Sequence, residues 1–151
     1  MDTVTYPDAR VAQFLVHHFL PVKVSVKENA RLVEDYLVSW APNIVILDEK
    51  GLVHYRLEGY LPPEDFVAYL SLGIGKYWLN RKQFAKAGER FQEVSERHAG
   101  TDVGAEALYW LGVARYKQAR DPGQLRPSWQ KLAQDYPLSE WAKRTNIPGK
   151  T

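Results

Sequence analysis

Residues 36–59, YLVSWAPNIVILDEKGLVHYRLEG, predict a strand, a tight turn and a second strand. The apolar run at residues 44–47 shows no polar alternation, which is typical of a strand buried on both faces, and residues 48–51 supply turn-forming side chains directly after it. Residues 52–57 alternate apolar and polar side chains instead. We therefore expect the first strand to be central in a sheet and the second to lie nearer an edge. Pro42 stands at the head of the first strand, where a missing backbone donor is tolerated.

Helices and strands alternate on both sides of this hairpin. Residues 8–18 show the helical spacing of apolar side chains, and residues 28–37 show it again. Between them, residues 21–26 alternate valines with lysine and serine, which predicts a short strand. Pro63 and the acidic residues after it predict another helix start. Residues 1–70 are thus predicted to form an α/β module with a mixed sheet covered by helices.

The second part of the chain, residues 71–148, carries helical signals only. It contains an internal repeat, because LGIGKY at residues 72–77 recurs as LGVARY at 111–116, and FQEV at 91–94 recurs as WQKL at 129–132. We interpret the repeat as two helical hairpins, followed by a short capping helix that begins at Ser139 and ends by Pro148. Gly73 and Gly112 each cost ~1 kcal/mol inside a helix, so they predict close approach between helices.

Aromatic and polar side chains of the helical part recur at equivalent positions of the repeat. We expect most of four ring side chains to be buried between the hairpins: Tyr77, Trp110, Tyr116 and Trp129. Polar residues on the first helix of each hairpin are candidates for a surface that faces a partner protein. These candidates are Lys76, Asn80, Arg115 and Gln118.

The composition is that of a globular protein, since 45% of the 151 residues are apolar and 13% are aromatic. A net charge of +2, from 20 basic and 18 acidic residues, gives no general attraction to nucleic acid or to an anionic membrane. No apolar run approaches the ~20 residues of a membrane span, and no signal peptide is visible. We therefore expect a soluble, cytoplasmic protein that binds neither nucleic acid nor membranes.

No cofactor or metal site is predicted. His17 and His18 are adjacent on a helix and point in different directions, and no third ligand has metal-binding spacing. His54 is isolated and is expected at the surface. The sequence contains no cysteine, which excludes thiolate metal sites and thiol redox chemistry for these residues.

The first module resembles the thioredoxin fold, in the branch where a Trp-Cys-x-x-Cys-Lys-x-Met motif precedes a Thr-Tyr or Thr-Phe pair. The matching residues are MDTVTYPD at 1–8, followed by FLPVKV at 19–24. In that family a cis-proline heads a strand beside the two cysteines, which corresponds to Pro42, and a glycine ends the next strand, which corresponds to Gly59. Asn43 departs from the threonine that often follows this proline. The resemblance implies a peptide-binding site at Ala41, Pro42 and Asn43.

The second module resembles tetratricopeptide repeats, which carry Leu-Gly and then Tyr in the first helix and Pro at the exit. Leu111, Gly112, Tyr116 and Pro137 occupy these positions. The repeat offset of about 39 residues exceeds the ~34 residues of the standard repeat. In the family, this pattern implies a concave face that binds peptides or partner proteins.

If the thioredoxin alignment holds, Met1 is the methionine of the motif, and the module lacks its first strand and the Cys-x-x-Cys pair. Two explanations stay open: a start codon assigned inside a longer reading frame, or a module that has lost its redox element. We favour the first, because the absent strand would be central and its loss removes a ladder partner from both neighbours. A chain without it should fold poorly, pair residues 21–26 directly with residues 43–47, or borrow a strand from a second copy.

The function predicted for these residues is non-catalytic. The helical repeats bind a protein or peptide partner, and the thioredoxin-like module serves as a scaffold. The alternative is a fragment of a thiol-disulfide oxidoreductase whose Cys-x-x-Cys lies immediately upstream of Met1 and whose repeats recruit the substrate. A homodimer formed through exposed sheet strands stays open as well.

The chain of 151 residues should show no disulfide reductase activity. Exchange requires an attacking thiolate, and this chain has none. The measurement is the turbidity assay of insulin reduction with dithiothreitol, in which the protein should not raise the rate above the reductant alone. A rate that increases with protein concentration would contradict the prediction.

Overall fold

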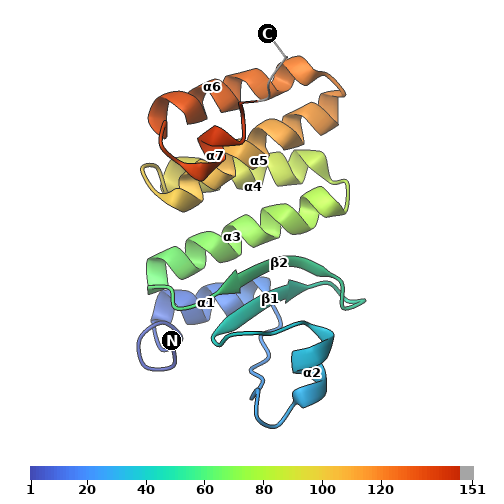
Figure 1. The fold of residues 1–151 in the computed structure, drawn as a ribbon, viewed down its shortest axis with the longest axis vertical. Coiled ribbons are helices and arrows are strands. Elements are labelled where there is room, and N and C mark those ends of the chain that lie inside the picture. The colour runs from blue at the N-terminus through green and yellow to red at the C-terminus, as the bar shows by residue number, and fades with distance from the viewer. Residues whose placement is uncertain (147–151) are drawn as a thin grey trace. The chain divides into compact units, whose positions relative to one another are not determined.

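The computed structural model describes residues 1–146 (Figure 1). The described residues fall into two compact units, residues 1–67 and the residues from Ala68 onward. The last two residues of the predicted helical array, 147 and 148, lie outside the described part. The helix α3 (Pro63–Asn80) begins in the first unit and continues into the second. None of the helices within residues 1–146 has the length and the hydropathy of a membrane-spanning segment.

The predicted hairpin is confirmed. Strand β1 (Asn43–Leu47) pairs antiparallel with β2 (Val53–Glu58), with Asn43 opposite Glu58 and Ile46 opposite Tyr55. Asp48 fixes the turn, because its carboxylate accepts hydrogen bonds from the backbone N–H groups of Lys50 and Leu52, both at 2.9 Å. These bonds, led by that from Leu52, lower the pKa of Asp48.

His54 is not the surface residue that the sequence suggested. Its Nε2 lies 3.2 Å from Oδ2 of Asp48, and the two side chains are 6% and 2% exposed. The isolated position of His54 in the sequence gave no sign of this contact, because its partner is set by the reversal of the chain at the turn.

The expected central position of β1 is wrong for the described residues. The sheet there has only two strands, so each strand has an outer edge. The apolar run at residues 44–47 is not buried on both faces either, since Ile46 is buried while Leu47 is 39% exposed. Within residues 1–146 no third strand pairs with the outer edge of β1. The exposure of Leu47 is a separate finding, because the faces of a strand are covered by elements that pack on the sheet and not by strands beside it.

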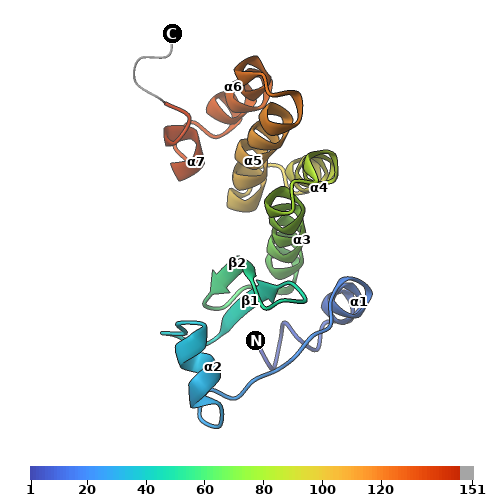
Figure 2. The same ribbon diagram turned by 90° about the vertical axis from the view of Figure 1, so that its right-hand side faces the viewer.

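The strand predicted over residues 21–26 is also absent, and direct pairing of this segment with β1 is wrong. Residues 19–25 have no regular structure and connect the helix α1 (Ala9–His18) to the helix α2 (Ala30–Asp35) (Figure 2). The valines of the segment are exposed, Val22 by 77%. Alternating valines favour a strand, but a strand forms only where a neighbour can accept and donate its backbone hydrogen bonds.

The first unit has a small core. Its helices lie on opposite sides of the hairpin in Figure 2, and α1 is capped by Asp8, which accepts a hydrogen bond from the N–H of Arg10. The buried residues in the first unit are Thr5, Val11, Ile46 and Phe66. So few buried side chains leave little hydrophobic stabilisation for a segment of this length.

The second unit is entirely helical in its described part, as predicted. After α3 come the helices α4 (Phe84–Arg97), α5 (Asp102–Ala119), a 3₁₀ turn η1 (Pro122–Leu125), α6 (Arg126–Asp135) and α7 (Glu140–Lys143). The helix expected after Pro63 and the first repeat helix are one continuous helix, α3, because no breaker separates them. The capping helix begins where expected, with Ser139 accepting a hydrogen bond from the N–H of Ala142.

Close packing at glycine holds the second unit together. A Cβ at Gly75 would lie 2.5 Å from Cε1 of Phe91, and a Cβ at Gly112 would lie 2.8 Å from Nε1 of Trp129. The predicted close approach at Gly112 is thereby confirmed. The sequence did not single out Gly75, and the role of Gly73 stays a prediction.

The expectation that most of the repeat aromatics are buried is wrong. Tyr77, Trp110 and Trp129 are half-buried, and Tyr116 is 37% exposed. Small side chains occupy the centre of this unit instead, since Ala105, Ala107 and Ala114 on α5 are fully buried. Helices that approach through alanine and glycine leave the large rings at the margins of the contact.

Replacing Gly75 by Ala should lower the free energy of unfolding by about 1–3 kcal/mol, because the new methyl group would overlap the ring of Phe91. Gly88→Ala is the matched control in the neighbouring helix. Its Cβ would meet Ala114 at an ordinary 4.0 Å, so this variant should be neutral or up to about 1 kcal/mol more stable. Urea unfolding followed by circular dichroism measures both, and equal stability of the two variants would contradict the packing described.

Candidate functional site

The first candidate site is the head of β1, where the sequence placed Ala41, Pro42 and Asn43. The Ala41–Pro42 peptide bond is cis, as the resemblance implied. The carbonyl of Pro42 accepts a hydrogen bond from the N–H of Gly59 at 2.9 Å, which ties the head of β1 to the end of β2. Ala41 is exposed, and no hydrogen bond within residues 1–146 involves its backbone. The backbone of Ala41 is therefore open to a ligand.

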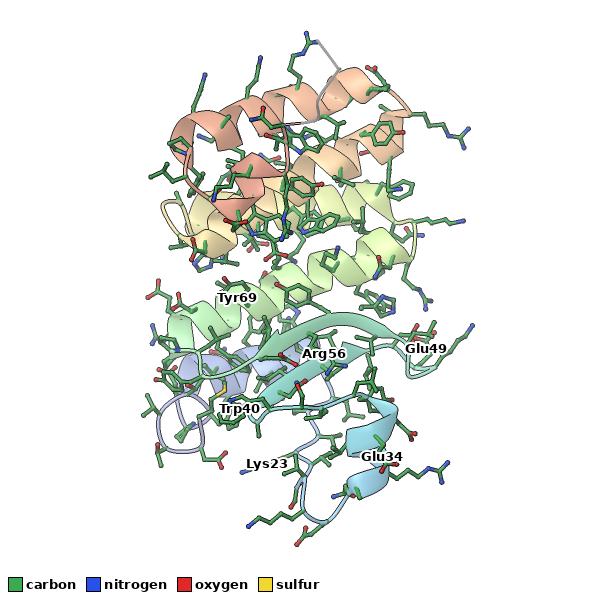
Figure 3. The ribbon with its side chains drawn as sticks, in the orientation of Figure 1. Lys23, Glu34, Trp40, Glu49, Arg56 and Tyr69 are labelled. Carbon is green, nitrogen blue, oxygen red and sulfur yellow. The ribbon has the colours of Figure 1, made fainter. Side chains whose placement is uncertain are left out.

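The side chain of Asn43 is held in place by its neighbours. Its Nδ2 donates to Oε1 of Glu58 at 2.9 Å, and its Oδ1 accepts from Nη1 of Arg56 at 3.2 Å. Arg56 also donates from Nη2 to the carbonyl of Tyr36, the C-cap of α2, and its side chain is labelled in Figure 3. These hydrogen bonds hold the loop before β1 in place. They also occupy the side-chain amide of Asn43, which is therefore not available to a ligand.

The second candidate site contains Lys76 of α3, whose surroundings the sequence did not indicate. Its Nζ lies 3.1 Å from the ring centroid of Trp110, and the indole Nε1 of Trp110 donates to Oε1 of Glu106 at 3.2 Å. Glu106 is 9% exposed, although it is charged. Burial lowers the pKa of Lys76 to about 8, and the negative charge of Glu106 opposes that shift. Glu106 and Trp110 are four residues apart on a helix, which is the sequence signal that could have paired them.

Aromatic rings continue from Trp110 across three helices. We call the group Tyr109, Trp110, Trp129 and Trp141 the aromatic cluster. Tyr109 stacks on Trp129 with ring centroids 5.2 Å apart, and the ring of Trp141 lies 5.3 Å from Tyr109 and 6.1 Å from Trp110. Arg144 lies over Trp141, with its Cζ 4.3 Å from the ring centroid. All four rings are half-buried, so each keeps some surface in contact with solvent.

The four predicted partner-binding residues do not form one group. Arg115 donates hydrogen bonds to Ser128 on α6 and to Gln92 on α4, at 3.3 and 3.2 Å, so its guanidinium joins helices within the unit. Asn80 is exposed at the end of α3, and Gln118 is exposed on α5. Of the four, only Lys76 lies against the aromatic cluster.

A separate cleft of about 330 Å³ lies between α3 and α4. It is lined by Trp78, Lys86, Glu89, Arg90 and Glu93. Nζ of Lys86 lies 4.5 Å from the Trp78 ring centroid. Because basic and acidic side chains alternate around the cleft, its charge selects for neither sign of ligand.

Comparison with known proteins gave one result. Residues 3–74 match the family model of a thioredoxin-like domain. No curated protein and no solved structure gave a significant match to the chain. The N-terminal part is thus thioredoxin-like and is followed by a mostly helical region, while the tetratricopeptide-like character of that region stays a prediction.

Replacing Lys76 by Met should stabilise the protein at pH 7. The pKa of Lys76 falls from 10.5 to about 8 on folding, so the folded state binds fewer protons than the unfolded state between these values. The free energy of unfolding of the wild type therefore rises through this pH range, while that of Lys76→Met does not. The advantage of the variant should be greatest below pH 8 and shrink towards pH 10. Urea unfolding across this range measures it. A variant less stable than the wild type at pH 7 would show that the contact with Trp110 outweighs burial.

Proposed function

We propose that this chain is a non-catalytic protein-binding module, in which the helical region binds a protein or peptide partner and the thioredoxin-like domain is its scaffold. The absence of cysteine from the 151 residues is consistent with a role that involves no thiol chemistry. The observation that carries the proposal is the aromatic cluster, whose rings are fixed by one another and yet stay partly exposed.

Rigid aromatic side chains are the usual anchors of protein interfaces, because they bury a large area at a small cost in side-chain entropy. Tyr109 and Trp110 come from α5, Trp129 from α6 and Trp141 from α7, so a partner that lies on the cluster would contact several helices at once. Because Tyr109 and Trp129 already stack on each other, these rings lose less conformational entropy when a partner binds.

Charge on the cluster favours an acidic partner. The cations of Lys76 and Arg144 lie against the rings of Trp110 and Trp141, while Glu106 is buried and already accepts from the indole of Trp110. The accessible charge beside the rings is therefore basic. A peptide that combines aromatic or aliphatic side chains with Asp or Glu fits this surface best. Asn80 and Gln118 stay predictions as additional contacts.

The proposal is tested with peptides selected from a random phage-displayed library on the immobilised chain. The selected peptides should be enriched in acidic and apolar residues, and Trp141→Leu should weaken their binding by at least about tenfold, as loss of an interface anchor does. Trp78→Leu, in the cleft between α3 and α4, is the matched control and should bind as the wild type does. Isothermal titration calorimetry measures the dissociation constants.

Two results would contradict the proposal. One is selection that yields no peptide of measurable affinity. The other is a set of peptides that bind Trp141→Leu as tightly as the wild type but lose affinity in Trp78→Leu. Circular dichroism of each variant shows whether its helices are intact before binding is compared.

A further inference from the structure

The first unit exposes much more apolar surface than the second. Within residues 1–146, every exposed large hydrophobic side chain except Tyr116 and Leu138 lies in residues 1–67. Leu20 is 92% exposed, Leu37 81% and Trp40 70%. Soluble proteins rarely leave this much apolar surface in water unless another molecule covers it. The first unit is therefore where a second interface should be sought, apart from the aromatic cluster.

The outer edge of β1 is open. The carbonyl of Pro42 accepts a hydrogen bond from the N–H of Gly59, and the N–H of Asp48 donates to the carbonyl of Leu52, so both residues face the β2 side of the hairpin. In an antiparallel pair, successive residues direct their N–H and C=O groups alternately towards the partner strand and away from it. The residues at odd positions therefore direct their N–H and C=O groups away from β2. This free edge consists of Ala41, Asn43, Val45 and Leu47. In the described part of the chain, no other strand pairs with it.

A second open backbone row lies in the same unit, in the connection from α1 to α2. No backbone hydrogen bond within residues 1–146 involves residues 20–24, and Lys23, labelled in Figure 3, is tied only through its side chain to Asp2 at 2.9 Å. In an extended segment, alternate residues direct their backbone groups to the same side. Leu20, Val22 and Val24 form one such row, and the other row contains Pro21, which has no N–H. Their side chains are all exposed.

The two rows match each other in a parallel arrangement. In parallel pairing, residues whose backbone groups point at each other carry their side chains on opposite faces of the sheet. Val22 and Val24 would then lie on the face of Ile44 and Ile46, while Lys23 would lie on the face of Asn43. The two valines would thus meet apolar side chains, and Lys23 would lie beside Asn43 on a face that also carries Val45 and Leu47.

We propose that two copies of this chain form a dimer by reciprocal exchange, in which residues 20–26 of each copy pair in parallel with the free edge of β1 in the other. The second copy is the occupant that the structure indicates, because every copy carries both an acceptor edge and an unpaired β-branched segment that do not pair within one chain. An exchange of identical elements closes after two copies around a two-fold axis. It converts two open edges into ladders and covers the exposed valines.

Sedimentation velocity over a range of concentrations tests the proposal. The wild type should associate reversibly to a dimer. Val24→Pro removes an N–H from the pairing row and should be monomeric, whereas Ser25→Pro, in the neighbouring row, is the matched control and should dimerise. Val45→Pro removes an outward N–H of β1 without removing a bond to β2, and it should be monomeric as well.

Mixing the two monomeric variants distinguishes lost pairing from lost folding. Val24→Pro keeps the acceptor edge and Val45→Pro keeps the donor segment, so the mixture should form heterodimers that neither variant forms alone. A synthetic peptide of residues 19–27, FLPVKVSVK, should bind monomeric Val24→Pro and should not bind Val45→Pro.

Three results would overturn the proposal: a wild type that stays monomeric at every concentration, a Val24→Pro variant that dimerises as well as Ser25→Pro, and a mixture that stays monomeric. These outcomes are independent of peptide binding at the aromatic cluster, since none of the substitutions touches the second unit.

Discussion

Backbone hydrogen bonding along β1 is the constraint on which the first unit depends. A strand inside a sheet pairs along both edges, and β1 pairs along one, with β2. The consequences extend through the unit: residues 44–47 are only partly covered, residues 19–25 have no regular structure, and the valines of that segment face solvent. The second unit has no such constraint, because each helix satisfies its own backbone and needs neighbours only for its side chains.

The elements that the sequence predicted correctly are those set by local chemistry. Asp8 and Ser139 cap their helices, Asp48 closes the hairpin, and the alternation of residues 52–57 gives β2. Each of these signals acts within a few residues, so it holds whatever the rest of the chain does. The resemblance to thioredoxins added the cis bond before Pro42, which residue spacing alone does not indicate.

The predictions that failed depend on what lies next to an element in space. The valines of residues 21–26 have the pattern of a strand, but a pattern cannot supply the neighbouring strand. Burial of the repeat aromatics failed because alanines and glycines on α5 take the central positions. The contact of Lys76 with Trp110 joins residues 34 positions apart in the sequence, on different helices. The local signal beside this contact, the i, i+4 spacing of Glu106 and Trp110, was not used in the sequence-based predictions.

The pairing of these two free edges between copies is tested most directly by amide hydrogen exchange, followed by NMR in dilute and in concentrated solution. In dilute solution the amides of Val22, Val24 and Val45 should exchange almost as fast as in an unfolded peptide, while that of Ile46, which faces β2, is protected. In concentrated solution, Val24 and Val45 should become protected together. Protection of Val24 and Val45 at every concentration would show that these edges already pair within one chain, which would contradict an open edge of β1 and its pairing between two copies.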